Sequence, residues 1–429
     1  MDPRWMNSFN GSALMAPVNF TVDPEALMTV PEIITHWGYP VEEYNVVTRD
    51  GYILTLHRIP YGRKGPSRKP RPVVLLQHGL LCTSSIWLLN LPSQSAGFVF
   101  ADAGFDVWLG NMRGNTYSKT HYSMDAKESR FWRFSWEEMA RYDLDAMVDG
   151  VLNVTQQEQL YYVGHSQGTL TMFAKLATDA VFARKIRKFF ALAPAARLVN
   201  VKGMFHTIGE AYPQLKLFYE MIGDHEFLPN NMFTRLLTDM LCDKKMKNPM
   251  CEDFIYQVSG PDSNQLNKTR IGIYLAHNPA GTSWRNLVHY AQMVKYGRMR
   301  PYDMGVEKSK MIYNMPHPPE FKLSNIDVPT YLFYSDSDWL ATTEGVEGFI
   351  LRQIDEKHIR LKRKLQDFNH NDFLWGQRAK EEIYDVIIEA VKYDHRRRRL
   401  KDGVQRYLKA KAGLNHNETH DSFLQSLLS

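Results

Sequence analysis

Apolar residues recur along this chain in patterns typical of strands. Residues 44–48 and 52–59 alternate apolar and polar positions on either side of Asp50-Gly51, and an Asp-Gly between alternating runs predicts a β-hairpin. Three later stretches are short, continuous apolar runs, which indicates strands buried on both faces, as in a parallel sheet. They are residues 73–76, 105–109 and 160–163.

Helical patterns lie between and after these runs. Ser135 and Glu138 have the spacing of a capping box, and apolar residues from Met139 to Val151 then recur at helical spacing. Strands that alternate with helices predict a doubly wound, mostly parallel sheet with right-handed crossovers. From residue 198 to 323 the chain turns to helical segments rich in Met, Phe and Tyr, which predicts an inserted helical cap.

These patterns divide the chain into five segments. After the cap, the strand-like run 329–334 and the helical run 380–393 resume the core pattern. We expect an irregular leader (1–30), a first part of the core (31–197), the helical cap (198–323), a second part of the core (324–395) and a basic extension (396–429).

Charge and hydropathy exclude several classes of function. The chain has 52 Lys and Arg against 47 Asp and Glu. Residues 396–429 hold eight of the basic and three of the acidic residues, which leaves 44 of each sign elsewhere. A neutral body offers nucleic acid no electrostatic footprint, so we expect no such partner. The longest apolar stretch, 189–196, is far shorter than the ~20 residues of a membrane-spanning helix.

The run Arg396–Arg399 is interpreted as part of a solvated, partly disordered extension. A processing site or a contact with an anionic membrane remains an alternative for these arginines.

Cysteine usage predicts neither a disulfide scaffold nor a metal site. There are three cysteines, with no Cys-x-x-Cys and no His cluster at ligand spacing, so these residues do not describe a metal site. Cys242 and Cys251 lie nine positions apart and are able to form a bridge. The first residues lack the continuous apolar segment of a signal peptide. Five sequons are nevertheless compatible with the secretory pathway, at Asn10, Asn19, Asn153, Asn267 and Asn417.

The clearest chemical signal is Gly164-His165-Ser166-Gln167-Gly168, a Gly-x-Ser-x-Gly motif. A predicted strand precedes it and a helix follows, so Ser166 is expected on a tight strand-to-helix turn whose glycines tolerate crowding. The helix also directs its N-terminal amides at the site. This context predicts an α/β-hydrolase fold with Ser166 as the nucleophile.

A serine hydroxyl is a poor nucleophile unless a histidine removes its proton and an acid orients that histidine. In this fold the acid and then the histidine follow the serine along the chain. Asp336 and Asp338 both follow the run 329–334 closely, and spacing does not choose between them. His370 is the best candidate base, because the alternatives lie in basic stretches typical of solvated surface. Those alternatives are His358 and His395.

A second element of the site is expected after the first buried run. Gln77-His78-Gly79-Leu80-Leu81 stands where this fold places an oxyanion donor, so the amides of Leu80 and Gln167 are predicted to stabilise the charge on the carbonyl oxygen. The alternative is a helix-capping glycine turn. His78 itself is expected to be structural.

The chain resembles the acid lipase family that includes gastric lipase and lysosomal acid lipase, over roughly residues 30–395. Matching motifs include Thr48-Arg-Asp-Gly-Tyr-Ile-Leu54, Gln77-His-Gly-Leu-Leu81, Asn111-Met-Arg-Gly-Asn115, the Gly164–Gly168 motif, His277-Asn-Pro-Ala-Gly-Thr-Ser283, Asp338-Trp-Leu-Ala341 and Asn369-His-x-Asp-Phe-x-Trp-Gly376. One departure is Tyr334-Ser-Asp-Ser-Asp338, which replaces the glycine-containing turn usual before the acid.

The resemblance implies Ser166 as nucleophile, His370 as base, Asp338 as acid, and a cap disulfide between Cys242 and Cys251. It also implies hydrolysis of triacylglycerols and cholesteryl esters through an acyl-enzyme, without a metal or organic cofactor, in lysosomes or outside the cell.

Two alternatives remain beside a lipase: a general carboxylesterase on soluble esters, and a non-catalytic lipid carrier on the same scaffold. The cap's large apolar residues either line an acyl pocket or form the cap's own core. They are Phe205, Phe218, Tyr219, Met221, Phe227 and Leu228.

Overall fold

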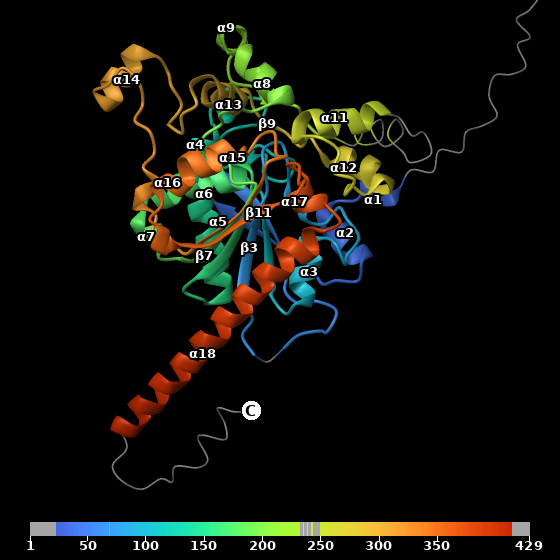
Figure 1. The fold of residues 1–429 in the computed structure, drawn as a ribbon, viewed down its shortest axis with the longest axis vertical. Coiled ribbons are helices and arrows are strands. Elements are labelled where there is room, and N and C mark those ends of the chain that lie inside the picture. The colour runs from blue at the N-terminus through green and yellow to red at the C-terminus, as the bar shows by residue number, and fades with distance from the viewer. Residues whose placement is uncertain are drawn as a thin grey trace, which may run out of the picture.

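A central sheet with helices on both faces organises the chain, as seen in the computed structural model (Figure 1). The structure describes residues 23–413, except 68, 232–234, 236–237, 239–241 and 243–248. The strands are β1 (Glu42–Val47), β2 (Tyr52–Ile59), β3 (Val73–Gln77), β4 (Asp106–Gly110), β5 (Thr120–His121), β6 (Leu160–His165), β7 (Ile186–Leu192), β10 (Thr330–Ser335) and β11 (Ile359–Leu365).

The main path of the sheet has the order β1-β2-β4-β3-β6-β7-β10-β11, with β5 paired to β2. The hairpin of β1 and β2 is antiparallel, and so is the pairing of β2 with β4. From β4 to β11 all neighbours are parallel. The predicted hairpin and the mostly parallel sheet are therefore confirmed, while β7 and β11 were not predicted as strands.

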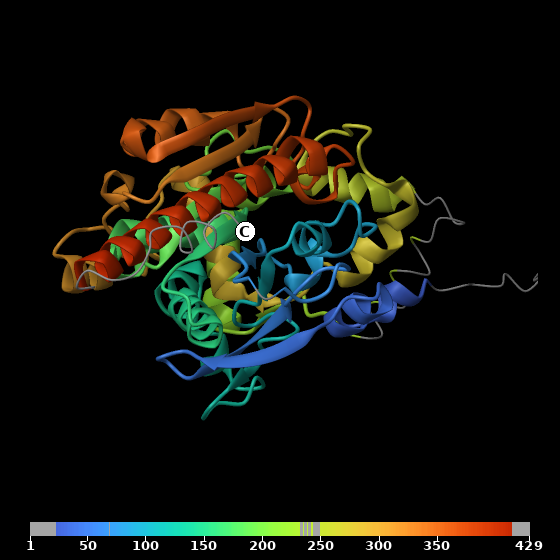
Figure 2. The same ribbon diagram turned by 90° about the horizontal axis from the view of Figure 1, so that it is seen from below.

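Alternate residues of the parallel strands enter two separate cores. In β3, Val73 and Leu75 pack into one core and Val74 and Leu76 into the other. Helices α5 (Leu144–Thr155) and α6 (Gln167–Thr178) cover the first face. Helices α2 (Val30–His36), α3 (Ala96–Asp102) and the beginning of α18 (Asp385–Gly413) cover the second (Figure 2). Burial on both faces explains the continuous apolar runs in the sequence.

The remaining helices flank the sheet or form the cap. Flanking helices are α1 (Pro24–Leu27), α4 (Trp136–Glu138), α7 (Ala180–Ala183), α15 (Thr343–Gly345), α16 (Leu351–Gln353) and α17 (Asp372–Trp375). Cap helices are α8 (Gly203–Glu210), α9 (Tyr212–Ile222), α11 (Pro249–Ser259), α12 (Ile271–His277), α13 (Trp284–Tyr296) and α14 (Val306–Tyr313). Within the cap, the short strands β8 (Glu226–Phe227) and β9 (Thr282–Ser283) pair with each other. Among the described helices, none is long and apolar enough to cross a bilayer.

Helices occur in both segments that flank the predicted core. The leader predicted as irregular contains α1, where the Glu25 carboxylate receives hydrogen bonds of 2.7 and 2.8 Å from the Arg270 guanidinium. Both side chains are buried, so this ion pair ties the leader to the cap. At the other end, α18 continues past residue 396 to Gly413, so this part of the extension, predicted to be solvated and partly disordered, is helical.

A buried ion pair joins the β1–β2 turn to the helices of the first face. The Arg113 guanidinium is 1% exposed and donates to Asp143 at 2.7 Å and to Asp50 at 2.6 Å. Its plane also lies over the Tyr52 ring, 4.0 Å from the ring centre. Removing one partner of a buried pair leaves an uncompensated charge in the core.

Arg113→Met is therefore expected to lower the free energy of unfolding by about 3–5 kcal/mol, because Asp143 loses its counter-charge. Urea denaturation measures the change. The control is Arg130→Met, which removes an exposed arginine paired with Glu128 and should leave the midpoint nearly unchanged. Equal midpoints for the two variants would contradict a structural role for Arg113.

Candidate active site

Ser166 lies at the sharp turn between β6 and α6. Its backbone has φ 53° and ψ −115°, a region that residues with a side chain rarely adopt. Such strain persists only where the surrounding structure enforces it, and it is typical of functional sites. The residue is 3% exposed.

Three glycines let backbone segments approach this turn closely. A Cβ on Gly168 would lie 2.5 Å from the Gln77 carbonyl oxygen, and one on Gly164 would lie 2.8 Å from the Gly168 backbone. A Cβ on Gly79 would lie 3.2 Å from the Cβ of Ser166. The motif glycines are therefore required by packing, and the loop after β3 lies directly against Ser166.

His370 and Asp338 contact each other in loops that follow β11 and β10. Nδ1 of His370 lies 2.9 and 3.0 Å from the two Asp338 carboxylate oxygens. A carboxylate only accepts, so Nδ1 carries the proton and Nε2 presents its lone pair. The backbone amides of Leu340 and Ala341 each donate to Asp338 at 2.8 Å, which fixes the carboxylate in place.

The other candidate side chains lie elsewhere. Asp336 is exposed and pairs with Lys364 at 2.8 Å, with its second contact to Thr343. His358 lies in the turn before β11 and is not buried. His395 is half-buried on α18, where burial lowers its pKa. Of these candidates, the structure brings only Asp338 and His370 together.

His165, inside the motif, supports His370. Its Nε2 donates to the His370 carbonyl at 2.9 Å, and the two ring centres are 4.8 Å apart. Burial, together with the nearby His370, holds the pKa of His165 well below 6.5, so this ring stays neutral. The Ser259 carbonyl, at the end of α11, accepts from the His370 amide at 2.9 Å. These positioning contacts leave no signal in the sequence, because nothing local links residues 165, 259 and 370.

The loop carrying Leu80 is held by His78. The Met112 amide donates to Nε2 of His78 at 3.1 Å, so Nδ1 is the protonated nitrogen and lies 2.8 Å from the Gly79 carbonyl. Burial lowers the pKa of His78 to about 4. Both ring nitrogens of His78 thus contact backbone groups, in line with the structural role expected for His78.

Gln167 begins α6 and connects the site to the cap. Its side-chain oxygen accepts from Asn286 of α13 at 2.9 Å, and Asn286 in turn accepts from the Trp136 amide at 2.8 Å. The cap therefore lies at the carboxyl end of β6, over Ser166.

The large apolar cap residues do not form a single buried lining. Phe205 is 7% exposed and packs near Tyr290, whereas Phe218, Met221 and Leu228 are exposed at the surface. Tyr219 contacts Asp224 and Arg285, and Phe227 packs on Trp284.

The structure pairs Cys242 with Cys251 in a disulfide. Among the sequons, Asn153 is exposed on α5 and Asn267 caps the short turn Lys268–Arg270. Asn10, Asn19 and Asn417 lie outside the described residues.

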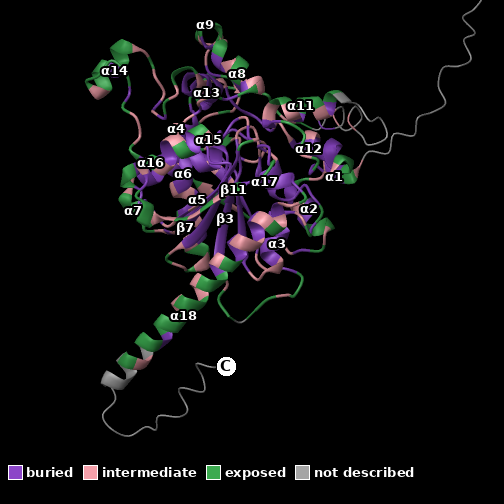
Figure 3. Cartoon of the chain, viewed as in Figure 1, coloured by how far each residue is buried: buried purple, intermediate pink, exposed green. Residues whose placement is uncertain are grey.

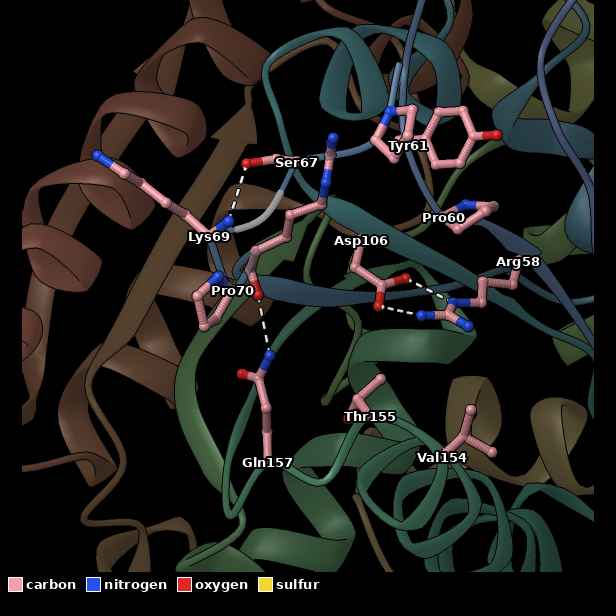
Figure 4. Close-up of a pocket in the computed structure, with 12 residues that line it drawn as sticks. Arg58, Pro60, Tyr61, Ser67, Lys69, Pro70, Asp106, Val154, Thr155 and Gln157 are labelled. Carbon is pink, nitrogen blue, oxygen red and sulfur yellow. Dashed lines mark hydrogen bonds and ion pairs between the residues drawn. The ribbon is translucent and has the colours of Figure 1, made fainter. Parts of the chain in front are cut away.

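A cavity of about 390 Å³ lies at the opposite end of the sheet (Figure 4). Arg58 and Asp106 line it, together with Gln157, Tyr61 and Lys69. Asp106 is the first residue of β4, whereas Ser166 follows the last residue of β6. This cavity is therefore separate from the Ser166 site.

Family models match most of the chain. The family described as a partial alpha/beta-hydrolase lipase region matches residues 30–91, and the alpha/beta hydrolase fold matches residues 72–377. Among solved structures, a putative lipase from Sulfolobus solfataricus superposes with a TM-score of 0.53 at 16% identity, covering 82% of this chain and 94% of that one. This likeness supports the fold alone.

Curated relatives are similar over nearly their whole length. Lipase lipl-1 of Caenorhabditis elegans is 47% identical, covering 87% of this chain and 93% of the relative. Human gastric triacylglycerol lipase is 41% identical and human lysosomal acid lipase/cholesteryl ester hydrolase 42%, each covering 86% of this chain and 92% of the relative. The chain therefore belongs to the lipase family of the α/β-hydrolase fold.

Proposed function

We propose that this lipase hydrolyses ester bonds of neutral lipids through a Ser166–His370–Asp338 triad. The observation that carries the proposal is the buried His370–Asp338 contact, in loops at the same end of the sheet as the strained Ser166 turn. His370 accepts the Ser166 proton as the hydroxyl attacks the ester carbonyl, and Asp338 stabilises the resulting imidazolium. His370 then protonates the leaving alcohol, and water releases the fatty acid from the acyl-enzyme by the same steps.

During attack, negative charge develops on the ester carbonyl oxygen, and hydrogen-bond donors that are already in place stabilise it. The amide of Gln167 at the start of α6 and that of Leu80, in the loop against Ser166, are proposed as this pair. The contact of Gly79 with Ser166 supports the second donor, because it places the loop beside the reacting hydroxyl.

The substrate class is inferred from the relatives, which are named for triacylglycerols and cholesteryl esters. A lysosomal or extracellular setting is proposed on the same basis. The Cys242–Cys251 disulfide supports it, because structural disulfides persist mainly in oxidising compartments. A glycoprotein is consistent with the exposed Asn153.

Ser166→Ala is expected to reduce cleavage of emulsified triolein and cholesteryl oleate by at least about a thousandfold, the scale of a lost triad serine. Fatty acid release is measured from about pH 4 to about pH 8, with a dissolved short-chain ester as a second substrate. Cleavage of the dissolved ester alone would favour a carboxylesterase. A variant as active as the parent, or no hydrolysis by either, would favour a lipid carrier.

Asp338→Asn is expected to lower kcat by about a thousandfold or more, because His370 loses the partner that fixes its tautomer. Asp336→Asn is the matched control: it lies two positions away, is exposed and should change kcat by less than about twofold. A larger loss in the control than in Asp338→Asn would assign the acid to Asp336.

Asp372, in the loop that carries His370, makes the free energy of unfolding depend on pH. Its carboxylate accepts from the Asn369 amide at 2.7 Å, and burial raises its pKa to about 7. The folded state thus holds this proton more tightly than the unfolded state, whose pKa is about 3.9. The stabilisation is complete below about pH 4 and is lost as the pH rises through about 7. Asp372→Asn should flatten the fall in unfolding free energy between these values in a denaturation series. An unchanged slope would contradict the raised pKa.

A further inference from the structure

The last helix leaves the body of the molecule on the side away from the cap. At its beginning, Ile387 and Val391 are fully buried in the second core. Asp394 pairs with Arg187 and Arg398 with Glu158, and beyond these contacts the helix projects away from the sheet (Figures 1 and 3). The match to the hydrolase fold ends at residue 377, before this helix begins.

The projecting part carries an apolar stripe. Leu400, Val404 and Leu408 are 63, 53 and 56% exposed. Residues four apart lie on the same side of an α-helix, so the three aliphatic side chains form one continuous row. Exposed rows of this kind normally mark a surface that another phase or molecule covers.

The charge around the row is strongly positive. Residues 396–413 contain eight Lys and Arg against one acidic residue, Asp402. Two such helices side by side would bring like charges together, which disfavours a second copy as the occupant. A basic helix with an apolar row is instead typical of helices that lie at the interface of a membrane containing anionic lipid.

The body beside the root of α18 is also basic. A cavity of about 590 Å³ opens there, and five basic residues line it against two acidic ones. They are Arg184, Arg187, Lys188, Arg360 and Arg397, with Asp327 and Asp394. Ile186 and Pro329, at the amino ends of β7 and β10, also line it, so this surface faces away from the cap.

We propose that α18 beyond Asp394 anchors the enzyme to an anionic membrane. Leu400, Val404 and Leu408 enter the headgroup region, and Arg396–Arg399 pair with lipid phosphates. Because the anchor lies opposite the cap, the Ser166 site faces away from the anchoring membrane. The enzyme then takes its ester substrate from a separate lipid particle while it stays attached.

The test measures co-sedimentation of the full chain with vesicles of phosphatidylcholine alone and with added phosphatidylserine. The parent should bind only the anionic vesicles, and less at high salt. Leu400→Gln/Val404→Gln/Leu408→Gln should weaken binding by about tenfold or more. Replacing Arg396–Arg399 with Gln should cost roughly fivefold per residue.

The matched control changes three exposed apolar residues of the body: Val47→Gln/Tyr122→Gln/Val181→Gln. It should bind like the parent, and all variants should cleave a dissolved ester at the parent rate, which shows that they are folded. Vesicle binding is independent of catalysis, so it also separates this proposal from the proposed function.

Three results would overturn the anchor. Equal binding of the parent to neutral and to anionic vesicles would show that binding does not require anionic lipid. Loss of vesicle binding in the arginine variant but not in the apolar variant would show that the apolar row does not enter the headgroup region. A parent dimer that the apolar variant dissociates, without vesicle binding, would assign the row to a second copy.

Discussion

The close approach of three backbone segments around Ser166 is the constraint on which the site depends. Gly164 and Gly168 let the turn between β6 and α6 close against Gln77, and Gly79 brings the loop after β3 against Ser166 itself. This packing holds Ser166 at a positive φ that it would not adopt alone. The Ser166 side chain, the first amides of α6 and the Leu80 loop are thereby set in one place before any substrate arrives, as the proposed stabilisation of an oxyanion requires.

The geometry of the proposed triad also depends on parts of the chain outside the sheet. The Ser259 carbonyl, at the end of cap helix α11, receives the His370 amide, while Asn286 of α13 bonds to Gln167. The leader contributes through the buried Glu25–Arg270 pair, which ties α1 to the cap. Because these contacts are buried, displacing the cap would disturb His370 and the start of α6 together, so the cap supports the site as well as covering it.

The two ends of the sheet carry different chemistry. The carboxyl ends of β6, β10 and β11 lead into Ser166, Asp338 and His370, under the cap. The amino ends are surrounded by arginines and lysines, and α18 extends this basic character beyond the body. A parallel sheet separates the two regions by the length of its strands, so a contact made at the basic end leaves the end that carries Ser166 free.

By itself the sequence determined the elements that depend on neighbouring residues. The Asp50-Gly51 turn, the apolar strands and the Gly164–Gly168 motif each encode local geometry within a few positions, and motif resemblance identified the family. The tertiary structure decided what depends on distant residues. Spacing left Asp336 and Asp338 equivalent; only packing shows that one lies buried against His370 while the other pairs with Lys364 at the surface. His165, β11 and the helical extension were missed for the same reason. A side chain's burial and partners are set by segments that the fold brings together, and no local pattern records them.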